Sequence, residues 1–455
     1  MKTTYINNLP IIEVDNFFSS NESDTILNKR RNDFEIAHSH YPTYYRNNDR
    51  LVEDNTSLSE QFYEKLQELN ISSLNEIKGV NNRIRLCRYQ KNQSFSKHQD
   101  GVHYLNDHYE SKYTFLLYLN NQDDFKGGGT EFFISKNDKK PHLMIKPKKG
   151  KLLIFDHRIW HQGAKVFSGN KYILRSDIYV NRKVDSNHHD GYIWNLLKVD
   201  DKHFFSCGRD TSIKLWNKDL QLVNAFKIHS KSVLKLVKLN DKEFISCSRD
   251  FTIKKWTNSG KVVSSICLNE MILNIVINTL DEQVIAVGTS GNIFILNSAL
   301  ILLKTIKVHK NWIWDIKLAE NNSVVTCSED GTAVLTNLLT STSKCLLTQK
   351  EALFSICMSN ESILFGTKSG TIINLSLITN EAENLALHKD IVRSIIRHKN
   401  EIFTCGEDNR IMRYNVLNGY TVQIRKSDNF IQDILILDDK IYAAGFDGRI
   451  TIDNI

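Results

Sequence analysis

A turn position that recurs every 39 or 40 residues constrains the fold of this chain more than any other feature. It first appears as Asp210 in the segment SCGRDTSIKLW. The matching positions follow at spacings of 40, 40, 40, 39, 39 and 39 residues: Asp250, Ser290, Asp330, Ser369, Asp408 and Asp447. A unit of this length cannot bury its apolar face alone, but units repeated around an axis bury it against their neighbours. The spacing therefore predicts a seven-bladed β-propeller over residues 188–455.

Four of these units share further polar residues at fixed distances from the turn aspartate. The histidines 20 or 21 residues upstream are His189, His229, His309 and His388, and the hydroxyl residues four positions upstream are Ser206, Ser246, Thr326 and Thr404. Trp216 and Trp256 close the first two repeats, and Tyr414 stands in the sixth. The pattern resembles WD repeats, in which such residues form a hydrogen-bonded set within a blade. The resemblance implies that these histidines are structural, and we expect repeats three, five and seven to rest on apolar packing alone.

The last repeat is shorter than the others. The sequence stops at Asp453-Asn454-Ile455, inside the expected third strand of the seventh blade. We expect residues near 180–188 to supply the missing outer strand, which would close the ring at the junction of the two domains.

The N-terminal part of the chain contains a different pattern, His98-Gln99-Asp100 followed at a distance by His161. Side chains at i and i+2 of a strand point to one face, so His98 and Asp100 can hold one ion together. A later strand of a jelly-roll barrel can return His161 to that ion. Two imidazoles and one carboxylate are the ligand set of the facial triad of non-haem Fe(II) oxygenases.

The surrounding motifs strengthen this interpretation. In order, the chain has Tyr89, the triad motif, Tyr118-Leu119-Asn120, Gly127–Phe132, Pro147, Gly150, Phe155, His161 and Lys171. This series resembles the catalytic domain of prolyl 4-hydroxylase-like Fe(II)/2-oxoglutarate dioxygenases over residues 83–182, and less specifically over residues 1–183. The resemblance implies a mainly β fold, a double-stranded β-helix (jelly roll) with N-terminal helices, for residues 1–183.

The resemblance also implies roles for individual residues. His98, Asp100 and His161 would hold Fe(II), and Lys171 would pair with the far carboxylate of 2-oxoglutarate. Tyr89 and Tyr118 would line the cosubstrate pocket, although plain barrel packing is an alternative for both. Arg175 lies on the same strand face as Lys171. It is a second carboxylate partner, an arginine at the barrel rim, or an arginine paired with Asp177 or another acid. O2 and ascorbate complete the expected cofactors, whereas the sequence positions of His103, His108 and His157 indicate ordinary polar residues.

Composition excludes few classes of protein. The net charge of +7 is mild for 455 residues and no basic run occurs, so a nucleic-acid partner is not expected. We also expect no membrane segment and no signal peptide. The eight cysteines do not form a disulfide pattern. Cys207, Cys247, Cys327 and Cys405 instead share one repeat position, which favours reduced thiols and a cytoplasmic location.

Together these features predict an enzyme, a hydroxylase of protein or peptide side chains with proline as the leading target. The propeller would raise the local concentration of the substrate or bind a partner. Two alternatives stay open. One is a binding scaffold whose oxygenase fold is only a platform, and the other is a hydroxylase of a free amino acid or small metabolite.

Overall fold

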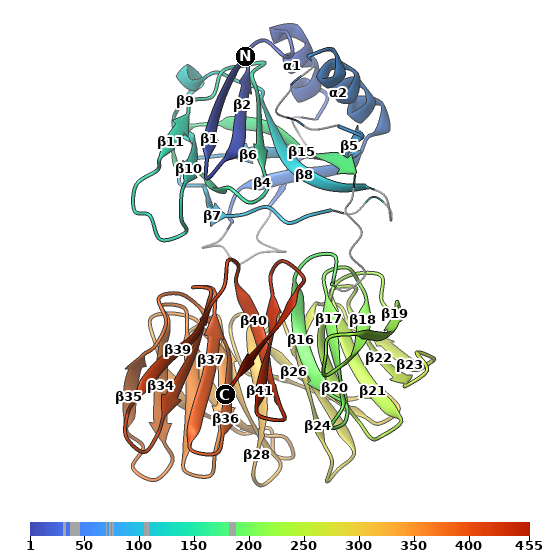
Figure 1. Ribbon diagram of the computed structural model, residues 1–455, viewed down its shortest axis with the longest axis vertical. Coiled ribbons are helices and arrows are strands. Elements are labelled where there is room, and N and C mark those ends of the chain that lie inside the picture. The colour runs from blue at the N-terminus through green and yellow to red at the C-terminus, as the bar shows by residue number, and fades with distance from the viewer. Residues whose placement is uncertain are drawn as a thin grey trace. The chain divides into compact units, whose positions relative to one another are not determined.

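The computed structural model describes residues 1–30, 33–36, 46–69, 71, 74, 77–103, 105, 109–181 and 188–455. The chain divides into two compact units, Met1–Val184 and Asp185–Ile455. Figure 1 shows two short helices against the strands of the first unit, and in the second unit many strands that run side by side. No helix of the described residues is long and apolar enough to cross a membrane.

The first unit is built on two main sheets. The large sheet has the order β1-β2-β12-β8-β15-β6-β4-β3, with β5 paired to β15, and the small sheet has the order β11-β10-β13-β7. A two-stranded sheet, β14-β9, completes the unit. The strands of the large sheet are β1 (Lys2–Ile6), β2 (Leu9–Val14), β3 (Glu35–Ile36), β4 (Asp49–Asp54), β5 (Gly79–Val80), β6 (Arg83–Tyr89), β8 (Tyr109–Tyr118), β12 (Leu152–Asp156) and β15 (Lys171–Asn181). The remaining strands are β7 (Phe95–His98), β9 (Phe125–Gly127), β10 (Thr130–Phe133), β11 (Leu143–Ile145), β13 (Trp160–Gly163) and β14 (Val166–Gly169).

Two helices cover the outer face of the large sheet. They are α1 (Ser20–Asn28), which begins with a capping box between Ser19 and Glu22, and α2 (Thr56–Glu68), capped by Asn55. The backbone N–H of Glu22 donates to the Ser19 hydroxyl, and the backbone N–H of Ser19 donates to the Glu22 carboxylate. These bonds give two free N–H groups at the helix start an acceptor and stabilise the first turn. Phe62 of α2 packs on Phe115 of β8 with ring centroids 4.6 Å apart. The predicted mainly β oxygenase fold with N-terminal helices is confirmed.

Alternation along β15 decides which side chains face the interior between the sheets. Tyr172, Leu174 and Ile178 belong to the core under the helices, while Ile173 belongs to the core between the two sheets. Because side chains of a strand alternate between faces, Lys171, Arg175 and Asp177 share the interior face with Ile173. The strand thus places three charged groups inside the barrel.

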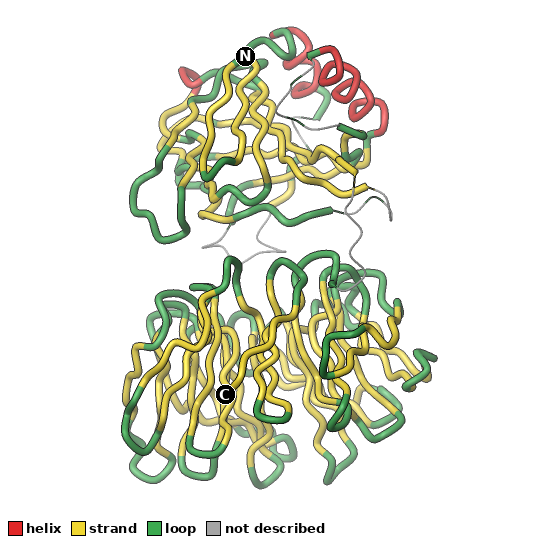
Figure 2. Tube along the Cα trace, in the orientation of Figure 1, coloured by secondary structure: helices red, strands yellow, loops and turns green. Residues whose placement is uncertain are grey.

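The second unit contains a repeated four-stranded sheet. Its sheets are β16-β17-β18-β19, β20-β21-β22-β23, β24-β25-β26-β27, β28-β29-β30-β31, β32-β33-β34-β35, β36-β37-β38-β39 and the three-stranded β40-β41-β42. The first strands of successive sheets contact one another, and β40 contacts β16. This closed ring of antiparallel sheets, with strands yellow in Figure 2, is the predicted β-propeller.

The strand bounds repeat regularly around the ring. The inner strands are β16 (Ile193–Lys198), β20 (Val233–Lys238), β24 (Ile272–Asn278), β28 (Ile313–Ala319), β32 (Leu353–Met358), β36 (Val392–His398) and β40 (Ile431–Leu437). The second strands are β17 (His203–Gly208), β21 (Glu243–Ser248), β25 (Gln283–Gly288), β29 (Ser323–Ser328), β33 (Ser362–Thr367), β37 (Glu401–Gly406) and β41 (Lys440–Gly445). The third strands are β18 (Ile213–Asn217), β22 (Thr252–Thr257), β26 (Asn292–Asn297), β30 (Thr332–Asn337), β34 (Thr371–Ser376), β38 (Arg410–Asn415) and β42 (Ile450–Asn454). The outer strands are β19 (Leu222–Phe226), β23 (Val262–Cys267), β27 (Leu302–Lys307), β31 (Ser343–Thr348), β35 (Ala382–Ala386) and β39 (Thr421–Lys426).

Among the described residues the last sheet has three strands. The prediction that residues near 180–188 supply its outer strand falls largely on residues 182–187, which lie outside the described residues, and it stays a prediction. The backbone N–H of His189 does donate to the carbonyl of Gly448, 2.8 Å away, just before β42. His309 makes the same contact with Gly291 at 3.0 Å, immediately after the outer strand β27.

The polar set of the first blade is complete. His189 contacts Asp210 through Nδ1 at 2.9 Å and Ser206 Oγ through Nε2 at 2.6 Å, and Trp216 Nε1 donates to the same hydroxyl at 2.6 Å. In the second blade the expectation that the tryptophan belongs to the hydrogen-bonded set is wrong. Trp256 Nε1 is buried without a hydrogen-bond partner among the described residues, because the ring packs between phenylalanines such as Phe205, 5.3 Å away.

Blades three and five correct another expectation, that apolar packing alone holds them. Ser290 and Ser369 occupy the turn position where other blades have aspartate. The backbone N–H of Ser290 donates to Glu270 at 3.2 Å, and that of Ser369 donates to Glu351 at 2.7 Å. A glutamate from the preceding loop thus supplies the carboxylate that the turn itself lacks.

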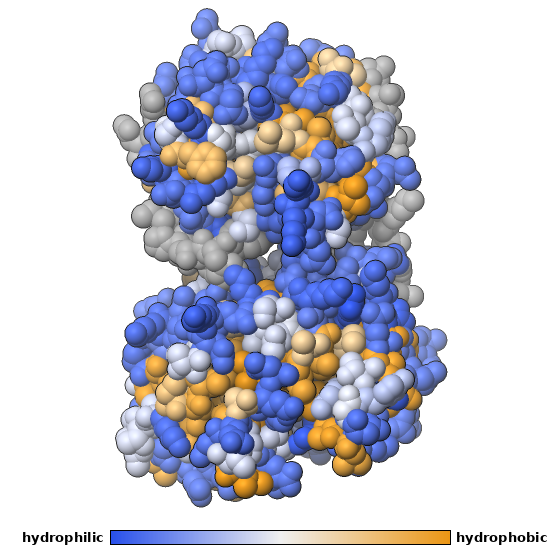
Figure 3. All heavy atoms as spheres, turned by 90° about the vertical axis from the view of Figure 1, so that its left-hand side faces the viewer, coloured by the Kyte–Doolittle hydropathy of each residue, from blue (hydrophilic) through white to orange (hydrophobic). Residues whose placement is uncertain are grey.

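Several of the exposed apolar residues of the propeller lie at equivalent turns. Ile301, Leu339, Ile378 and Leu417 are all more than half exposed and precede outer strands or lie in the turn before them. Figure 3 shows apolar patches on the surface of this unit. The cores themselves lie within and between neighbouring sheets, where Phe205 of β17 meets Phe244 of β21 and Trp256 of β22.

Candidate active site

The two triad histidines are cross-strand neighbours of the small sheet. β7 and β13 are antiparallel, and His98 lies opposite His161, with ring centroids 4.2 Å apart. In each ring Nδ1 contacts a backbone carbonyl two residues upstream, Ser96 O at 2.7 Å and Ile159 O at 2.9 Å. Such a contact makes Nδ1 the protonated nitrogen and leaves the Nε2 lone pair available to a metal. Burial lowers the pKa of both imidazoles, which favours the neutral form that metal binding needs.

Asp100 completes the cluster from a loop rather than from the strand. β7 ends at His98, so the expectation that both residues share one strand is wrong. The backbone N–H of Asp100 instead donates to the carbonyl of His157 at 3.0 Å, which turns the chain out of the sheet. The Asp100 carboxylate lies 3.4 Å from His161 Nε2 and 3.7 Å from His98 Nε2. Ligand atoms of all three residues lie within 4.8 Å of one another.

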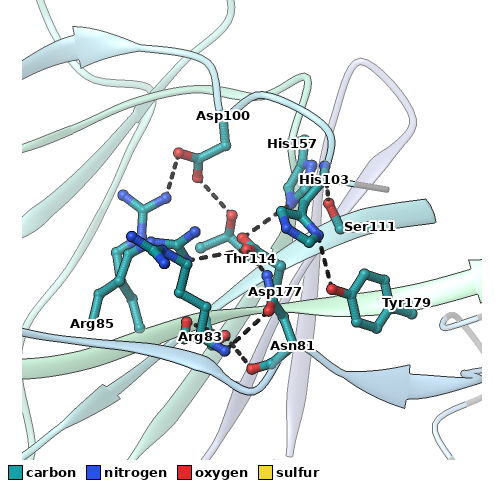
Figure 4. A network of polar contacts seen from close by, with 12 residues as sticks. Asn81, Arg83, Arg85, Asp100, His103, Ser111, Thr114, His157, Asp177 and Tyr179 are labelled. Atoms are coloured by element: carbon teal, nitrogen blue, oxygen red, sulfur yellow. Dashed lines mark hydrogen bonds and ion pairs between the residues drawn. The ribbon is translucent and has the colours of Figure 1, made fainter. Parts of the chain in front are cut away.

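Two side chains of the large sheet hold the Asp100 carboxylate. Arg175 Nη2 donates to Oδ1 at 2.6 Å. Thr114 Oγ1 donates to Oδ2, also at 2.6 Å (Figure 4). Burial alone would raise the pKa of Asp100, but the charge of Arg175, followed by those of His161 and His98, holds it well below its usual range. Of the alternatives for Arg175, the structure shows the pairing with an acid, and the acid is Asp100.

Lys171 lies deeper along the same strand face. It is 1% exposed and stands opposite Tyr89 of β6. Its ammonium is 5.2 Å from the centroid of the Tyr89 ring and 5.8 Å from that of Tyr118, so the three predicted pocket residues do come together. No hydrogen bond or ion pair joins this ammonium to any of the described residues. Burial lowers the pKa of Lys171 to about 8, which shows how poorly the charge is compensated.

A polar network beside the triad was missed at the sequence level. His157 is 3% exposed, and its Nε2 lies 3.7 Å from Asp177, which accepts from Arg85 and Asn81 at 3.1 Å each (Figure 4). Burial lowers the pKa of His157, so the ring is neutral there. A more distant part of the network holds His103, whose Nδ1 is 2.8 Å from the Tyr179 hydroxyl. The signal for Asp177 was available in the sequence, because alternation along β15 places it on the same face as Lys171 and Arg175. His108 lies outside the described residues.

Comparison with known families bears on both units. Residues 84–176 match the 2OG-Fe(II) oxygenase superfamily, and residues 182–217 and 301–337 match the WD domain, G-beta repeat. The chain joins an oxygenase domain to WD repeats. No curated protein matches the chain.

The oxygenase superfamily implies Fe(II), 2-oxoglutarate and O2. The side chains of this oxygenase domain fit that requirement. Two imidazole nitrogens and one carboxylate converge on one point, a donor set that suits Fe(II). A buried ammonium without an anion among the described residues lies farther inside the barrel, where a carboxylate of 2-oxoglutarate would satisfy it.

Proposed function

We propose that the oxygenase domain is prolyl 4-hydroxylase-like and hydroxylates a side chain of a protein or peptide, with proline as the favoured target. The propeller would bind that client or a partner. The observation that carries the proposal is the combination inside one barrel of the His98, Asp100 and His161 cluster with the buried Lys171. A scaffold has no physical need for an uncompensated buried ammonium, because burying a charge without a partner is costly.

In this proposal His98, Asp100 and His161 hold Fe(II). The bound iron and 2-oxoglutarate supply the oxidising chemistry that inserts one oxygen atom of O2 into a C–H bond of the substrate, with succinate and CO2 as coproducts. Arg175 and Thr114 bond the two oxygens of Asp100 and so orient it as a ligand. The charge of Arg175 also keeps the Asp100 carboxylate ionised before a metal ion binds.

Lys171 would hold the far carboxylate of 2-oxoglutarate, with Tyr89 and Tyr118 flanking it. The Tyr118 hydroxyl is 2.7 Å from Thr130 Oγ1, which holds the ring in place. Two phenylalanines beside the triad exclude water from one side of the site. Phe95 stacks on His98 with ring centroids 3.7 Å apart, and Phe155 meets His161 edge to face at 4.5 Å. Ascorbate would serve as the reductant that keeps the iron in its ferrous state.

A cytoplasmic location belongs to the same proposal. All eight cysteines are free, and the four at the common repeat position are buried. Burial raises the pKa of these thiols, that of Cys247 to about 12, so they are poor nucleophiles. Such thiols support a reducing compartment.

The test is succinate formation from 2-oxoglutarate with Fe(II), O2 and ascorbate, in the presence of proline-containing peptides or of free proline. We expect peptide-stimulated turnover in the wild-type chain and none in His98→Ala or Lys171→Ala. Stimulation by free proline alone would favour the small-metabolite alternative. A wild-type chain that binds Fe(II) and 2-oxoglutarate but never forms succinate would favour the scaffold.

A further inference from the structure

A β-bulge recurs at one position of every inner strand of the propeller. The register with the second strand shifts between residues 193 and 195, 233 and 235, 272 and 274, 313 and 315, 353 and 355, 392 and 394, and 431 and 433. A bulge places two residues of one strand opposite a single residue of the partner strand, so two consecutive side chains can point to the same side of the sheet. Side chains of both residues therefore line the central channel at its mouth.

The mouth encloses a cavity of about 130 Å³ that is lined from all seven inner strands. Three of the six tryptophans of the chain, Trp194, Trp312 and Trp314, line this cavity. Trp314 contacts Trp312 and Phe354 with centroids 5.3 and 5.0 Å apart, which makes an aromatic wall on one side. Aromatic groups at a cavity wall offer large apolar contact area to a ligand.

The polar groups on the aromatic side of the mouth are paired internally. Trp314 Nε1 donates to Glu329 at 2.7 Å, and Arg393 Nε donates to Glu407 at 2.9 Å. Lys317 lies 3.0 Å from Asp315. This side therefore presents apolar rings and little uncompensated charge.

The opposite side of the mouth, formed by β16 and the second blade, differs in one respect. Trp194 Nε1 and Arg249 Nε are both buried, and neither has a hydrogen-bond partner among the described residues. The Arg249 guanidinium lies 5.3 Å from the centroid of the Trp194 ring, so the two donors belong to one stacked pair. Lys235 lines the same cavity. No carboxylate of the described residues lies within ion-pair distance of Arg249 or Lys235.

We propose that this mouth binds an acidic peptide segment. A side-chain carboxylate of the peptide accepts from Arg249, Lys235 and Trp194 Nε1, and an adjoining apolar side chain packs on Trp314 and Phe354. Buried donors left without acceptors cost free energy, and a carboxylate from a ligand supplies the missing acceptors. The proposal deepens the recruiting role proposed for the propeller and rests on it.

The charges of the cavity favour one carboxylate over a polyanion. Asp315 and Asp433 also line it. Asp433 lies beside β16, where its carboxylate accepts from Asn195 Nδ2 at 2.7 Å. Both aspartates accept backbone N–H groups of a neighbouring blade, from Ile356 at 2.8 Å and from Leu196 at 3.0 Å, so they are fixed in place. A phosphate chain crossing the mouth would bring several negative charges toward these carboxylates, whereas a single glutamate or aspartate side chain brings one.

The test uses the full chain without iron or 2-oxoglutarate, so its outcome is independent of succinate formation. Random hexapeptides displayed on phage are selected on the immobilised protein, and an enriched peptide is titrated by tryptophan fluorescence beside its Glu→Gln or Asp→Asn isostere. We expect enrichment of an acidic residue next to an apolar one, and at least tenfold weaker binding of the isostere. Arg249→Gln should weaken binding at least tenfold and Trp194→Phe, which keeps an aromatic ring, by a smaller factor.

Lys261→Gln, at an exposed turn, is the matched control and should bind as the wild type does. Unchanged melting temperatures of the variants would show that they fold. Selection without acidic enrichment, equal binding of the isostere, or equal binding by Arg249→Gln would each overturn the proposal. Displacement of the peptide by inorganic phosphate at equal concentration would also overturn it, because the site would then bind anions without regard to the apolar side chain.

Discussion

Buried histidines next to aspartates occur in both units, and they serve different purposes. In the propeller, His189 uses both ring nitrogens, Nδ1 toward Asp210 and Nε2 toward Ser206. In the oxygenase domain, His98 and His161 give Nδ1 to backbone carbonyls and turn Nε2 toward Asp100 and toward each other. A ring whose nitrogens are both used can only stabilise a fold. Rings whose second nitrogens converge on one carboxylate can bind a metal ion.

The largest expected difference between the two kinds of site concerns metal binding. Asp100→Ala should reduce affinity for Fe(II) more than roughly 100-fold, since even partners of metal ligands contribute 10- to 100-fold. Asp250→Ala, which removes the carboxylate 3.0 Å from His229, should leave metal affinity unchanged. Anaerobic titration with Fe(II), followed by the shift in melting temperature, measures both. Equal losses in the two variants would erase the distinction.

Acid should destabilise the propeller through its His–Asp pairs. Burial would raise the pKa of Asp210, but His189 and the bonded N–H groups hold it well below its usual range. A carboxyl whose folded pKa is depressed stabilises the fold above its unfolded pKa of about 4, and this contribution is lost as pH falls toward the folded value. Asp210→Asn should therefore cost about 3 kcal/mol at pH 7 and less at pH 3. Asp447→Asn, in a repeat without the histidine, should lower the free energy of unfolding by less at both pH values. Urea unfolding measures both variants.

Lys171 offers the reverse case, a buried charge without a partner among the described residues. Replacing it by the similarly sized methionine should stabilise the ligand-free chain by roughly 1–3 kcal/mol and abolish the thermal stabilisation by 2-oxoglutarate. Because burial lowers its folded pKa to about 8, the wild type should gain stability from about pH 8 toward the ordinary lysine pKa near 10.4. Lys171→Met should lack this gain. The affinity of the wild type for 2-oxoglutarate should decline above about pH 8, as the Lys171 ammonium loses its proton.

The smallest effect separates two tryptophans at equivalent positions. Trp216→Phe removes an indole N–H that donates to Ser206, whereas Trp256→Phe removes one that has no partner among the described residues. Trp216→Phe should therefore cost about 1 kcal/mol more than Trp256→Phe. Chemical unfolding of the two variants decides the matter, and an equal cost would mean that Trp256 has a hydrogen bond in solution.

Sequence reasoning succeeded where a residue's role depends on spacing. The 39- and 40-residue repeat predicted the propeller, and the order of short motifs predicted the oxygenase domain. The resemblance to the oxygenase family implied that Lys171, Tyr89 and Tyr118 share a pocket, and the pairing of β15 with β6 and β8 does bring them together. Sequence reasoning failed for Glu270 and Glu351, which replace a missing turn aspartate from another loop. No repeat position predicts such a substitute.

By itself, the sequence determined the two fold types and the three residues that converge as a candidate metal site, since periodicity and motif order are local properties of a chain. Only the tertiary structure decided the partner of each polar group. It assigned Arg175 to Asp100, left Trp256 Nε1 and Trp194 Nε1 without acceptors among the described residues, and placed Asp100 beyond the end of β7. The physical reason is that the two partners of such a contact are distant in the sequence. A hydrogen bond depends on positions within a few tenths of an ångström, and those positions are set by strands that lie far apart in the sequence.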